Sequence, residues 1–292
     1  MNAQALALVI AGASLHAVWN LVAKRASGGL AFVWLYGWVS LALFLPIALW
    51  MGGAAGVPLG PAAWVAIVAS AVLHVIYALV LQRGYRVADL SLVYPMARGT
   101  GPLFAVLGAV LLLDNRPGVA GWLGIAAILA GIFLMAGGGL LRRLGAGADP
   151  ALLRGLGWGA LTGLFIAAYT LVDGWAIQVL GLAPLAYYAL GLAVRSAVLA
   201  PWALRDRAGL AVEWRRNRGR IVAVGALSPL AYLLVLTAMQ LAPLAYVAPA
   251  REVSMMIGLG LGALWLRERV TPARIAGCLL MLGGVVLLAA QR

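Results

Sequence analysis

The chain has 292 residues, of which 65% are hydrophobic and only 10% are charged, and its mean hydropathy is +1.03. Soluble domains carry far more charge than this, so the composition indicates a polytopic α-helical membrane protein. The net charge of +13 does not indicate a nucleic-acid-binding protein, because the basic residues lie between apolar runs, where they act as topology signals.

Hydropathy predicts ten membrane spans of roughly 20 residues each, which leaves no room for a soluble domain. We expect these spans at residues 3–23, 30–50, 62–82, 91–113, 118–140, 155–177, 183–204, 220–240, 245–266 and 273–290. The longest polar stretches lie at residues 142–154 and 205–220. The second of these predicts either a short amphipathic helix at the membrane surface or a solvated loop.

The two halves of the chain resemble each other. Ala97-Arg98 in the fourth span matches Ala250-Arg251 in the ninth, 153 residues later, and each pair follows a proline. The same offset aligns two further pairs of residues, Gly124 with Gly277 and Gly131 with Gly284. We therefore predict an all-α fold built from two five-helix repeats, over residues 1–145 and 146–292.

Five spans in each repeat have a topological consequence. An odd number of spans makes the second repeat enter the membrane from the opposite side, so the repeats are inverted. Inverted repeats are typical of secondary transporters whose binding site lies near the bilayer midplane. The alternative is a duplicated helical scaffold that transports nothing.

The loop charges predict an orientation. One set of loops carries most of the basic residues, and the other set carries only Arg116 and Arg292. The positive-inside rule assigns the basic set to the cytoplasm, which makes both termini extracytoplasmic. The basic set consists of Lys24, Arg25, Arg83, Arg86, Arg142, Arg143, Arg154, Arg205, Arg207, Arg215, Arg216, Arg218, Arg220, Arg267, Arg269 and Arg274.

Arg98 and Arg251 are the first candidates for a substrate site. A charge inside a membrane span costs at least ~2.5–3.5 kcal/mol, so a counter-ion, water or bound anion must compensate it. Pro95 and Pro249 lie a turn or less earlier, and each frees a backbone carbonyl. The arginines either bind or gate an anionic or zwitterionic cargo, or tie helices together.

Three acidic or titratable side chains inside the spans are candidates for coupling transport to a proton. Glu252 either neutralises Arg98 or Arg251 across the interior or carries a coupling proton. His74 titrates near neutral pH when unperturbed. Asp173 is expensive in lipid, so we expect it to face the interior, where it could pair with Arg195.

Several polar and aromatic side chains share helix faces. His16, Trp19 and Asn20 lie together on the first span, and Ser70, His74 and Tyr77 lie together on the third. Tyr232 shares a face with Ser228 on the eighth span. These faces predict a wet interior, in which Tyr94 is a further aromatic candidate. Interhelical hydrogen bonding, core packing and interfacial belts are the alternatives for the individual residues.

The sequence contains no zinc-binding HExxH pattern, no Cys/His metal spacing, no P-loop and no catalytic triad. We therefore expect no metal, no cofactor and no enzymatic activity.

Two segments resemble a known family. His16–Arg25, HAVWNLVAKR, and Leu264–Val285, LWLRERVTPARIAGCLLMLGGV, are similar to signatures of EamA-type proteins in the drug/metabolite transporter superfamily. The resemblance covers the whole chain and implies ten spans and the export or exchange of a small metabolite. Relatives of this type usually have cytoplasmic termini, whereas the loop charges here predict the reverse.

The sequence thus predicts a multi-pass secondary transporter of a bacterial-type inner membrane that works by alternating access. The interior charges are Arg98, Arg195 and Arg251 against Asp173 and Glu252, which favours a zwitterionic or anionic metabolite. We expect a monomer or weak homodimer whose partners are a small-molecule substrate and membrane lipid, with no nucleic acid. The alternatives are efflux of aromatic or cationic compounds, flipping of a lipid or lipid-linked sugar, and a non-transporting scaffold.

Overall fold

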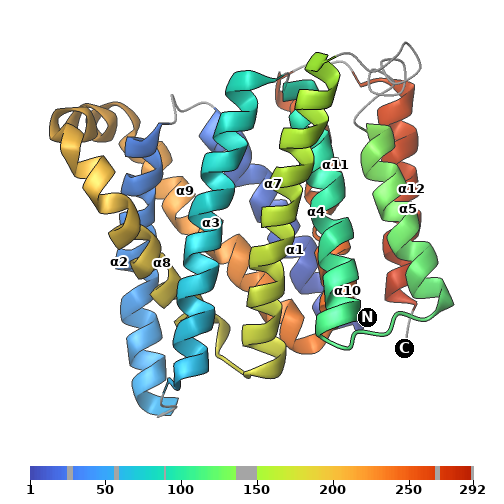
Figure 1. Ribbon diagram of the computed structural model, residues 1–292, viewed down its shortest axis with the longest axis horizontal. Coiled ribbons are helices and arrows are strands. Elements are labelled where there is room, and N and C mark those ends of the chain that lie inside the picture. Colours follow the sequence, from blue (N-terminus) through green and yellow to red (C-terminus); the bar gives the residue numbers. More distant parts are fainter. Residues whose placement is uncertain (25–28, 56–58, 89, 136–149, 267–269, 291–292) are drawn as a thin grey trace.

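The computed structural model describes residues 1–24, 29–55, 59–88, 90–135, 150–266 and 270–290, and its regular secondary structure is entirely helical (Figure 1). The first half contains α1 (Ala3–Lys24), α2 (Leu30–Ala55), α3 (Pro61–Val87), α4 (Leu90–Leu112) and α5 (Val119–Met135). The second half contains α7 (Pro150–Gly174), the π-helical turn η1 (Trp175–Val179), α8 (Pro184–Ala203), the 3₁₀ turn η2 (Leu204–Asp206), α9 (Arg207–Leu241), α10 (Leu244–Ala250), α11 (Val253–Leu266) and α12 (Pro272–Ala289).

Eight segments of the described residues are long and apolar enough to cross a membrane, and α5 is a shorter apolar helix. The chain is therefore a multi-pass membrane protein. The difference from the ten predicted spans has a local cause. The polar stretch 205–220 is neither a loop nor a separate surface helix, because α9 begins at Arg207 and continues into the apolar segment. As a result, Pro184–Leu241 counts as one segment although it contains both α8 and α9.

Residues at the helix starts explain several boundaries. Proline occupies the first turn of α3, α8 and α12, where its fixed φ suits a helix and its missing N–H is not needed. Asp206 caps α9, and its carboxylate accepts a hydrogen bond from the backbone N–H of Gly209 at 2.8 Å. Gly181 adopts a φ of 66° in the turn that leads into α8, a conformation that favours glycine.

The start of α1 and the end of α12 lie at the same end of the helix bundle (Figure 1). The amino group of Met1 donates a hydrogen bond to the backbone carbonyl of Leu288 at 3.0 Å, which joins these two helices. The opposite end holds the end of α3 and the starts of α7, α9 and α12, so it gathers the basic residues described there (Figure 1). These residues include Arg83, Arg86, Arg154, Arg218 and Arg274.

Some sequence predictions fall on residues outside the described ranges. They are the boundary between the two repeats at residues 145 and 146, and the loop charges Arg25, Arg142, Arg143, Arg267, Arg269 and Arg292.

Helices from the two halves of the chain interleave. α1 packs against α9 and α11, while α7 packs against α3 and α4. α2 contacts both α8 and α9, and α3 contacts α8. α5 packs mainly against α12 at one side of the bundle and makes smaller contacts with α4 and α10 (Figure 1). Most of the core is therefore formed between the halves and not within them.

Matching glycines bring α5 and α12 into close contact. A Cβ atom built on Gly124 would lie 2.8 Å from the carbonyl oxygen of Gly284, and one on Gly131 would lie 2.6 Å from that of Gly277. Backbones can approach this closely only where side chains are absent. Gly124 therefore contacts Gly284, the sequence counterpart of Gly131, and Gly131 contacts Gly277, the sequence counterpart of Gly124.

The largest apolar cluster fills the half of the bundle nearest to the start of α1. It includes Val9 from α1, Ile67 from α3 and Leu236 and Met239 from α9, all of which are fully buried. Leu244 at the start of α10 belongs to the same cluster. This half of the molecule is therefore tightly packed and leaves the opposite half to hold a cavity.

Candidate functional site

A cavity of about 630 Å³ lies among helices α1, α2, α3, α8 and α9, with single residues from α4 and α7 and with Arg251, Glu252 and Ser254 from the junction of α10 and α11. Its wall begins at Gly12 and Val235, next to the apolar cluster, and continues to Leu30, Arg86 and Trp202 at the far ends of their helices. Arg86 and Trp202 are exposed. The cavity therefore opens toward the end of the bundle that carries the basic residues and is closed toward the start of α1.

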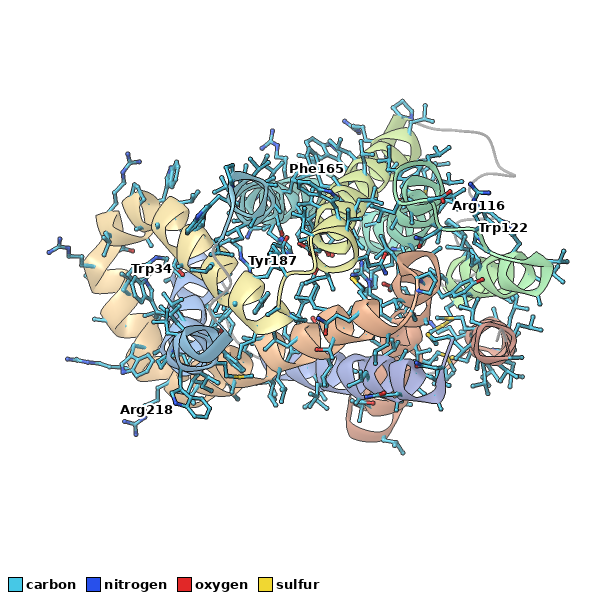
Figure 2. The ribbon with its side chains drawn as sticks, turned by 90° about the horizontal axis from the view of Figure 1, so that it is seen from below. Trp34, Arg116, Trp122, Phe165, Tyr187 and Arg218 are labelled. Carbon is cyan, nitrogen blue, oxygen red and sulfur yellow. The ribbon has the colours of Figure 1, made fainter. Side chains whose placement is uncertain are left out.

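The view along the helices separates interior side chains from peripheral ones (Figure 2). Arg116 and Arg218 point away from the bundle, whereas Tyr187 lies among the helices and is 4% exposed. The volume of the cavity is in the range of small-molecule sites in proteins.

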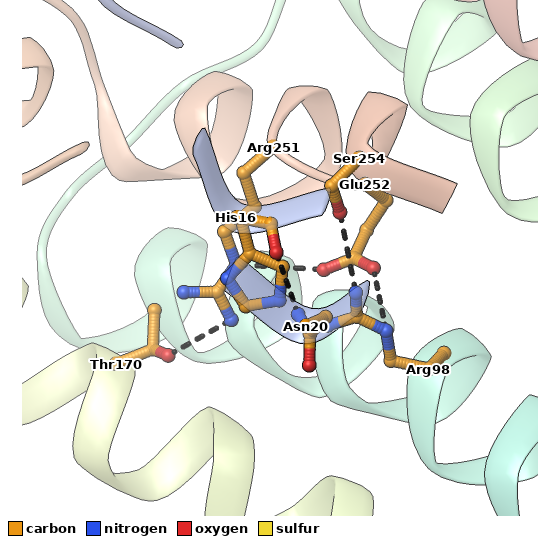
Figure 3. A network of polar contacts seen from close by, with 7 residues as sticks. All are labelled: His16, Asn20, Arg98, Thr170, Arg251, Glu252 and Ser254. Carbon is orange, nitrogen blue, oxygen red and sulfur yellow. Dashed lines mark hydrogen bonds and ion pairs between the residues drawn. The ribbon is translucent and has the colours of Figure 1, made fainter. Parts of the chain in front are cut away.

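Arg98 and Arg251, the two arginines predicted from the repeat, meet at one carboxylate on the cavity wall (Figure 3). Nε of Arg98 lies 3.2 Å from Oε2 of Glu252, and Nε of Arg251 lies 3.5 Å from Oε1 of the same residue. The side chain of Glu252 is 1% exposed, so the carboxylate is shielded from water, while Arg98 and Arg251 keep 18% and 11% of their side chains exposed. We call Arg98, Glu252 and Arg251 the ion triad.

Hydroxyl groups extend the ion triad to neighbouring helices. Arg98 donates a hydrogen bond to Ser254 on α11 at 3.2 Å, and Arg251 donates one to Thr170 on α7 at 3.3 Å. The triad thus connects α4 and α7 with the junction of α10 and α11 (Figure 3). Glu252 is placed between both arginines, as the sequence suggested for a neutralising carboxylate.

The helix that carries Arg251 is interrupted there. The expected single span 245–266 is instead two helices, α10 and α11, separated by Arg251 and Glu252. The N–H of Glu252 bonds to the carbonyl of Pro249 at 3.0 Å, and that of Ser254 bonds to Arg251 at 3.2 Å, which is the tighter 3₁₀ pattern. Pro249 lacks an N–H and weakens the helix at this point. In α4, by contrast, the helix continues through Pro95 and Pro102.

Asp173 forms a second polar centre beside the cavity and is fully buried. Ser70 on α3 and Tyr187 on α8 donate hydrogen bonds to its Oδ1 at 2.5 and 2.6 Å, and Tyr232 on α9 donates to Oδ2. Three hydroxyl donors satisfy a carboxylate and stabilise its charged form. The possible pair of Asp173 with Arg195 does not form among the described residues, although both line a void of about 10 Å³, which is room for about one water.

The two histidines line the cavity, as does Tyr77. His16 contacts Trp19 edge to face at 5.0 Å between ring centroids. His74 stacks on Tyr169 at 3.9 Å, and its Nδ1 lies 2.8 Å from the carbonyl oxygen of Ser70. His16 and Trp19 from the predicted α1 face, and His74 and Tyr77 from the α3 face, therefore line one interior space.

Two predicted residues do not line that space. Asn20 is exposed, and its amide donates to the carbonyl of His16 at 2.8 Å within α1. Tyr94 is 40% exposed and lies under the guanidinium of Arg98 at 5.8 Å. Trp38, a mid-span aromatic, is also exposed at 45%.

Sequence patterns alone missed part of the site. Tyr169 and Tyr188 line the cavity and Tyr187 binds Asp173, whereas Arg195, which was predicted as an interior charge, lines the cavity as well. Trp19-Asn20-Leu21-Val22 in the first repeat matches Tyr169-Thr170-Leu171-Val172 in the second, so this internal match contained a signal for Tyr169. Tyr187 and Tyr188 lie near the start of a span, where tyrosine usually indicates the membrane interface.

The described residues contain no group of three or more His, Cys, Asp or Glu side chains that could hold a metal ion. The chemistry of the cavity is instead that of guanidinium groups, tyrosine hydroxyls and aromatic faces. Such a lining suits noncovalent recognition of an organic molecule.

Comparison with known proteins finds a family match for the second half of the chain. The sequence pattern described as the EamA-like transporter family matches residues 153–290, which lie within the predicted second repeat at residues 146–292. No curated protein matches. A solved structure titled "Crystal structure of protein" is similar, with a TM-score of 0.74, 16% sequence identity and coverage of 98% of this chain and 96% of that chain.

The structural likeness shows that the fold occurs over the whole length of another chain, and the sequence match supplies the family. The interrupted helix lies wholly within the matched region, and so do Arg251 and Glu252 of the ion triad, whereas Arg98 lies outside it. Residues 153–290 therefore form an EamA-like transporter domain of the drug/metabolite transporter superfamily.

Proposed function

We propose that the protein is a secondary transporter that moves a small zwitterionic or anionic metabolite across the inner membrane by alternating access. The observation that carries this proposal is the cavity, which is closed at one end of the bundle and open at the other, with Arg98 and Arg251 on its wall. A transporter of this kind exposes one central site to each side in turn.

Helix packing supports the ten-span inverted repeat on which the mechanism depends. In that arrangement the first to fifth spans correspond to α7, α8, α9, the α10–α11 pair and α12. If each helix is replaced by its counterpart in the other repeat, the α1–α9 contact becomes an α7–α3 contact, and the α1–α11 contact becomes an α7–α4 contact. Both of these contacts are present. The exchanged glycine contacts between α5 and α12 follow the same two-fold relation.

The interrupted helix supports a role for the ion triad in the mechanism. Discontinuous helices at the interface of two repeats commonly bind substrates or coupling ions in transporters. Glu252 bridges an arginine from each repeat, so a change in the ion triad would alter the contacts of both repeats. Glu252, His74 and Asp173 remain our candidates for proton coupling, and His16, Trp19, Tyr77 and Tyr232 for contact with the cargo.

The charge of the cavity favours an anion or zwitterion over a cation. Four arginines line it among the described residues, and Glu252 is the carboxylate on its wall. Glu252 is already engaged by two guanidinium groups, which leaves it poorly suited as the counter-ion of a cationic drug. The loop charges support an orientation in which the open end faces the cytoplasm.

Counterflow in liposomes tests the proposal. Purified protein is reconstituted with unlabelled amino acids inside, and uptake of a labelled amino acid is measured. We expect Arg98→Ala and Arg251→Ala to abolish uptake while remaining monodisperse. The matched control is Arg116→Ala, because Arg116 forms only an exposed ion pair with Asp114 and should transport normally.

Other outcomes distinguish the alternatives. Uptake of tetraphenylphosphonium in place of the amino acid would indicate efflux of lipophilic cations, and scrambling of a fluorescent phospholipid would indicate a flippase. Normal counterflow in both arginine variants would remove these residues from the mechanism. Inactivity toward every solute would leave the scaffold.

A further inference from the structure

We propose that Arg195 on α8 binds the anionic group of the cargo, and that the cargo is an organic acid with a flat apolar body. This inference rests on the proposed transport function and narrows its substrate class. It assigns the charge recognition to the α2–α8 side of the cavity and not to the ion triad. The basis is that Arg98 and Arg251 form ion pairs with a carboxylate, whereas Arg195 does not among the described residues.

Arg98 and Arg251 already have a carboxylate partner. Both pair with Glu252, and each donates a further hydrogen bond to a hydroxyl group. The charge of each arginine is therefore already balanced by Glu252, and an incoming anion would have to compete with that carboxylate. Breaking a buried ion pair leaves an uncompensated charge and is costly.

Arg195 has no such partner. It lines the same cavity, and it forms no ion pair with a carboxylate among the described residues. Its Nε donates a hydrogen bond to the carbonyl of Gly191 in its own helix at 3.4 Å, and its guanidinium lies 5.0 Å from the ring of Tyr188. The nearby Asp173 is held by three hydroxyl groups.

A guanidinium that has no carboxylate partner inside a membrane protein is expensive unless an anion or water compensates its charge. Arginine presents several N–H donors in a planar fork, which suits the two oxygens of a carboxylate. A cavity open at one end allows such an anion to reach Arg195. The geometry is therefore that of a site completed by its ligand.

Aromatic walls flank Arg195 and define the rest of the cargo. Tyr188 and Tyr232 lie 5.4 Å apart between ring centroids, and both line the cavity. Trp34 lines it from α2 and is fixed by a hydrogen bond from its indole N–H to the carbonyl of Ser196 at 3.1 Å. Oriented aromatic faces near an arginine favour a ring or other flat apolar group attached to the anion.

Isothermal titration of the detergent-solubilised protein tests this assignment with three probes that share a phenyl body. They are phenylacetate, phenylalanine and phenethylamine, which carry a negative, a zwitterionic and a positive group at neutral pH. We expect phenylacetate to bind most tightly. Arg195→Gln should weaken it about 10- to 100-fold, because a charge-assisted hydrogen bond is lost.

Two further variants make the result specific. Arg195→Lys keeps the charge but not the fork, so its affinity should lie between those of the wild type and Arg195→Gln. Arg83→Gln removes the same charge from an exposed position on α3 outside the cavity and should bind like the wild type. Unchanged phenylacetate affinity in Arg195→Gln, tighter binding of phenethylamine than of phenylacetate, or no binding of phenylacetate would each overturn the assignment.

Counterflow of the same probes separates this inference from the proposed function. If phenylacetate binding depends on Arg195 but no solute shows counterflow, the proposed transport function is wrong and the Arg195 binding site stands. If phenylalanine shows counterflow but phenylacetate does not bind, the transport function stands and the assignment of Arg195 is wrong. Arg195→Gln should remain folded, because it removes a desolvated charge that has no carboxylate partner.

Discussion

Glu252→Gln is the perturbation that tests the ion triad most directly. The change keeps the shape of the side chain and removes its charge, which leaves Arg98 and Arg251 facing each other without a carboxylate. At an effective dielectric constant of about 20, opposite unit charges about 3.5 Å apart attract by roughly 5 kcal/mol. Desolvation offsets part of this attraction, and loss of one member of a buried pair costs about 3–5 kcal/mol in measured cases.

The chain offers a convenient assay for this loss of stability. Cys278 on α12 is its single cysteine and is partly buried, so a thiol-reactive dye reports its exposure as the protein unfolds on heating. A destabilisation of 3–5 kcal/mol corresponds to a fall in Tm of roughly 6–20 °C. Asp114→Asn is the matched control, since Asp114 pairs with Arg116 at the surface and should shift Tm little.

A double-mutant cycle strengthens the test. Arg98→Gln in the Glu252→Gln background should cost less than the sum of the two single changes, with a coupling of about 0.5–3 kcal/mol. A Glu252→Gln protein that unfolds within about 1 °C of the wild type, or additive effects in the cycle, would refute the triad as the link between the halves.

Three further changes should have distinct effects. Gly131→Ala places a Cβ atom 2.6 Å from the carbonyl oxygen of Gly277 and should destabilise the protein by about 1–3 kcal/mol, whereas Gly283→Ala, with open space around it, should not; equal Tm values would contradict the close α5–α12 contact. Asp173→Asn replaces an acceptor of three hydroxyl donors with a group that also donates, and should cost about 1–3 kcal/mol in the same assay, more than Ser70→Ala, which removes one donor. In a Cys278→Ser background, Arg216→Cys at the exposed start of α9 should resist an impermeant thiol reagent in intact cells and react after permeabilisation; labelling of intact cells would reverse the proposed orientation.

The sequence by itself determined the class of the protein, because apolar runs of about 20 residues have one stable solution in lipid, a helix. It also found Arg98 and Arg251 and the paired glycines, because a duplication leaves matching residues at a constant offset. His16 and His74 were found because helical periodicity assigns residues to faces, and interior charge or polarity is costly enough to indicate function.

Only the tertiary structure decided how these residues are partnered. Glu252 lies next to Arg251 in sequence, but its bridge to Arg98 depends on how α4 meets the junction of α10 and α11. The sequence allowed a pair between Asp173 and Arg195, but hydroxyl groups from three other helices bind the Asp173 carboxylate instead. Hydropathy cannot predict such contacts, because it is summed over each helix separately. Burial, ion pairing and the cavity arise where helices that are far apart in the chain pack together.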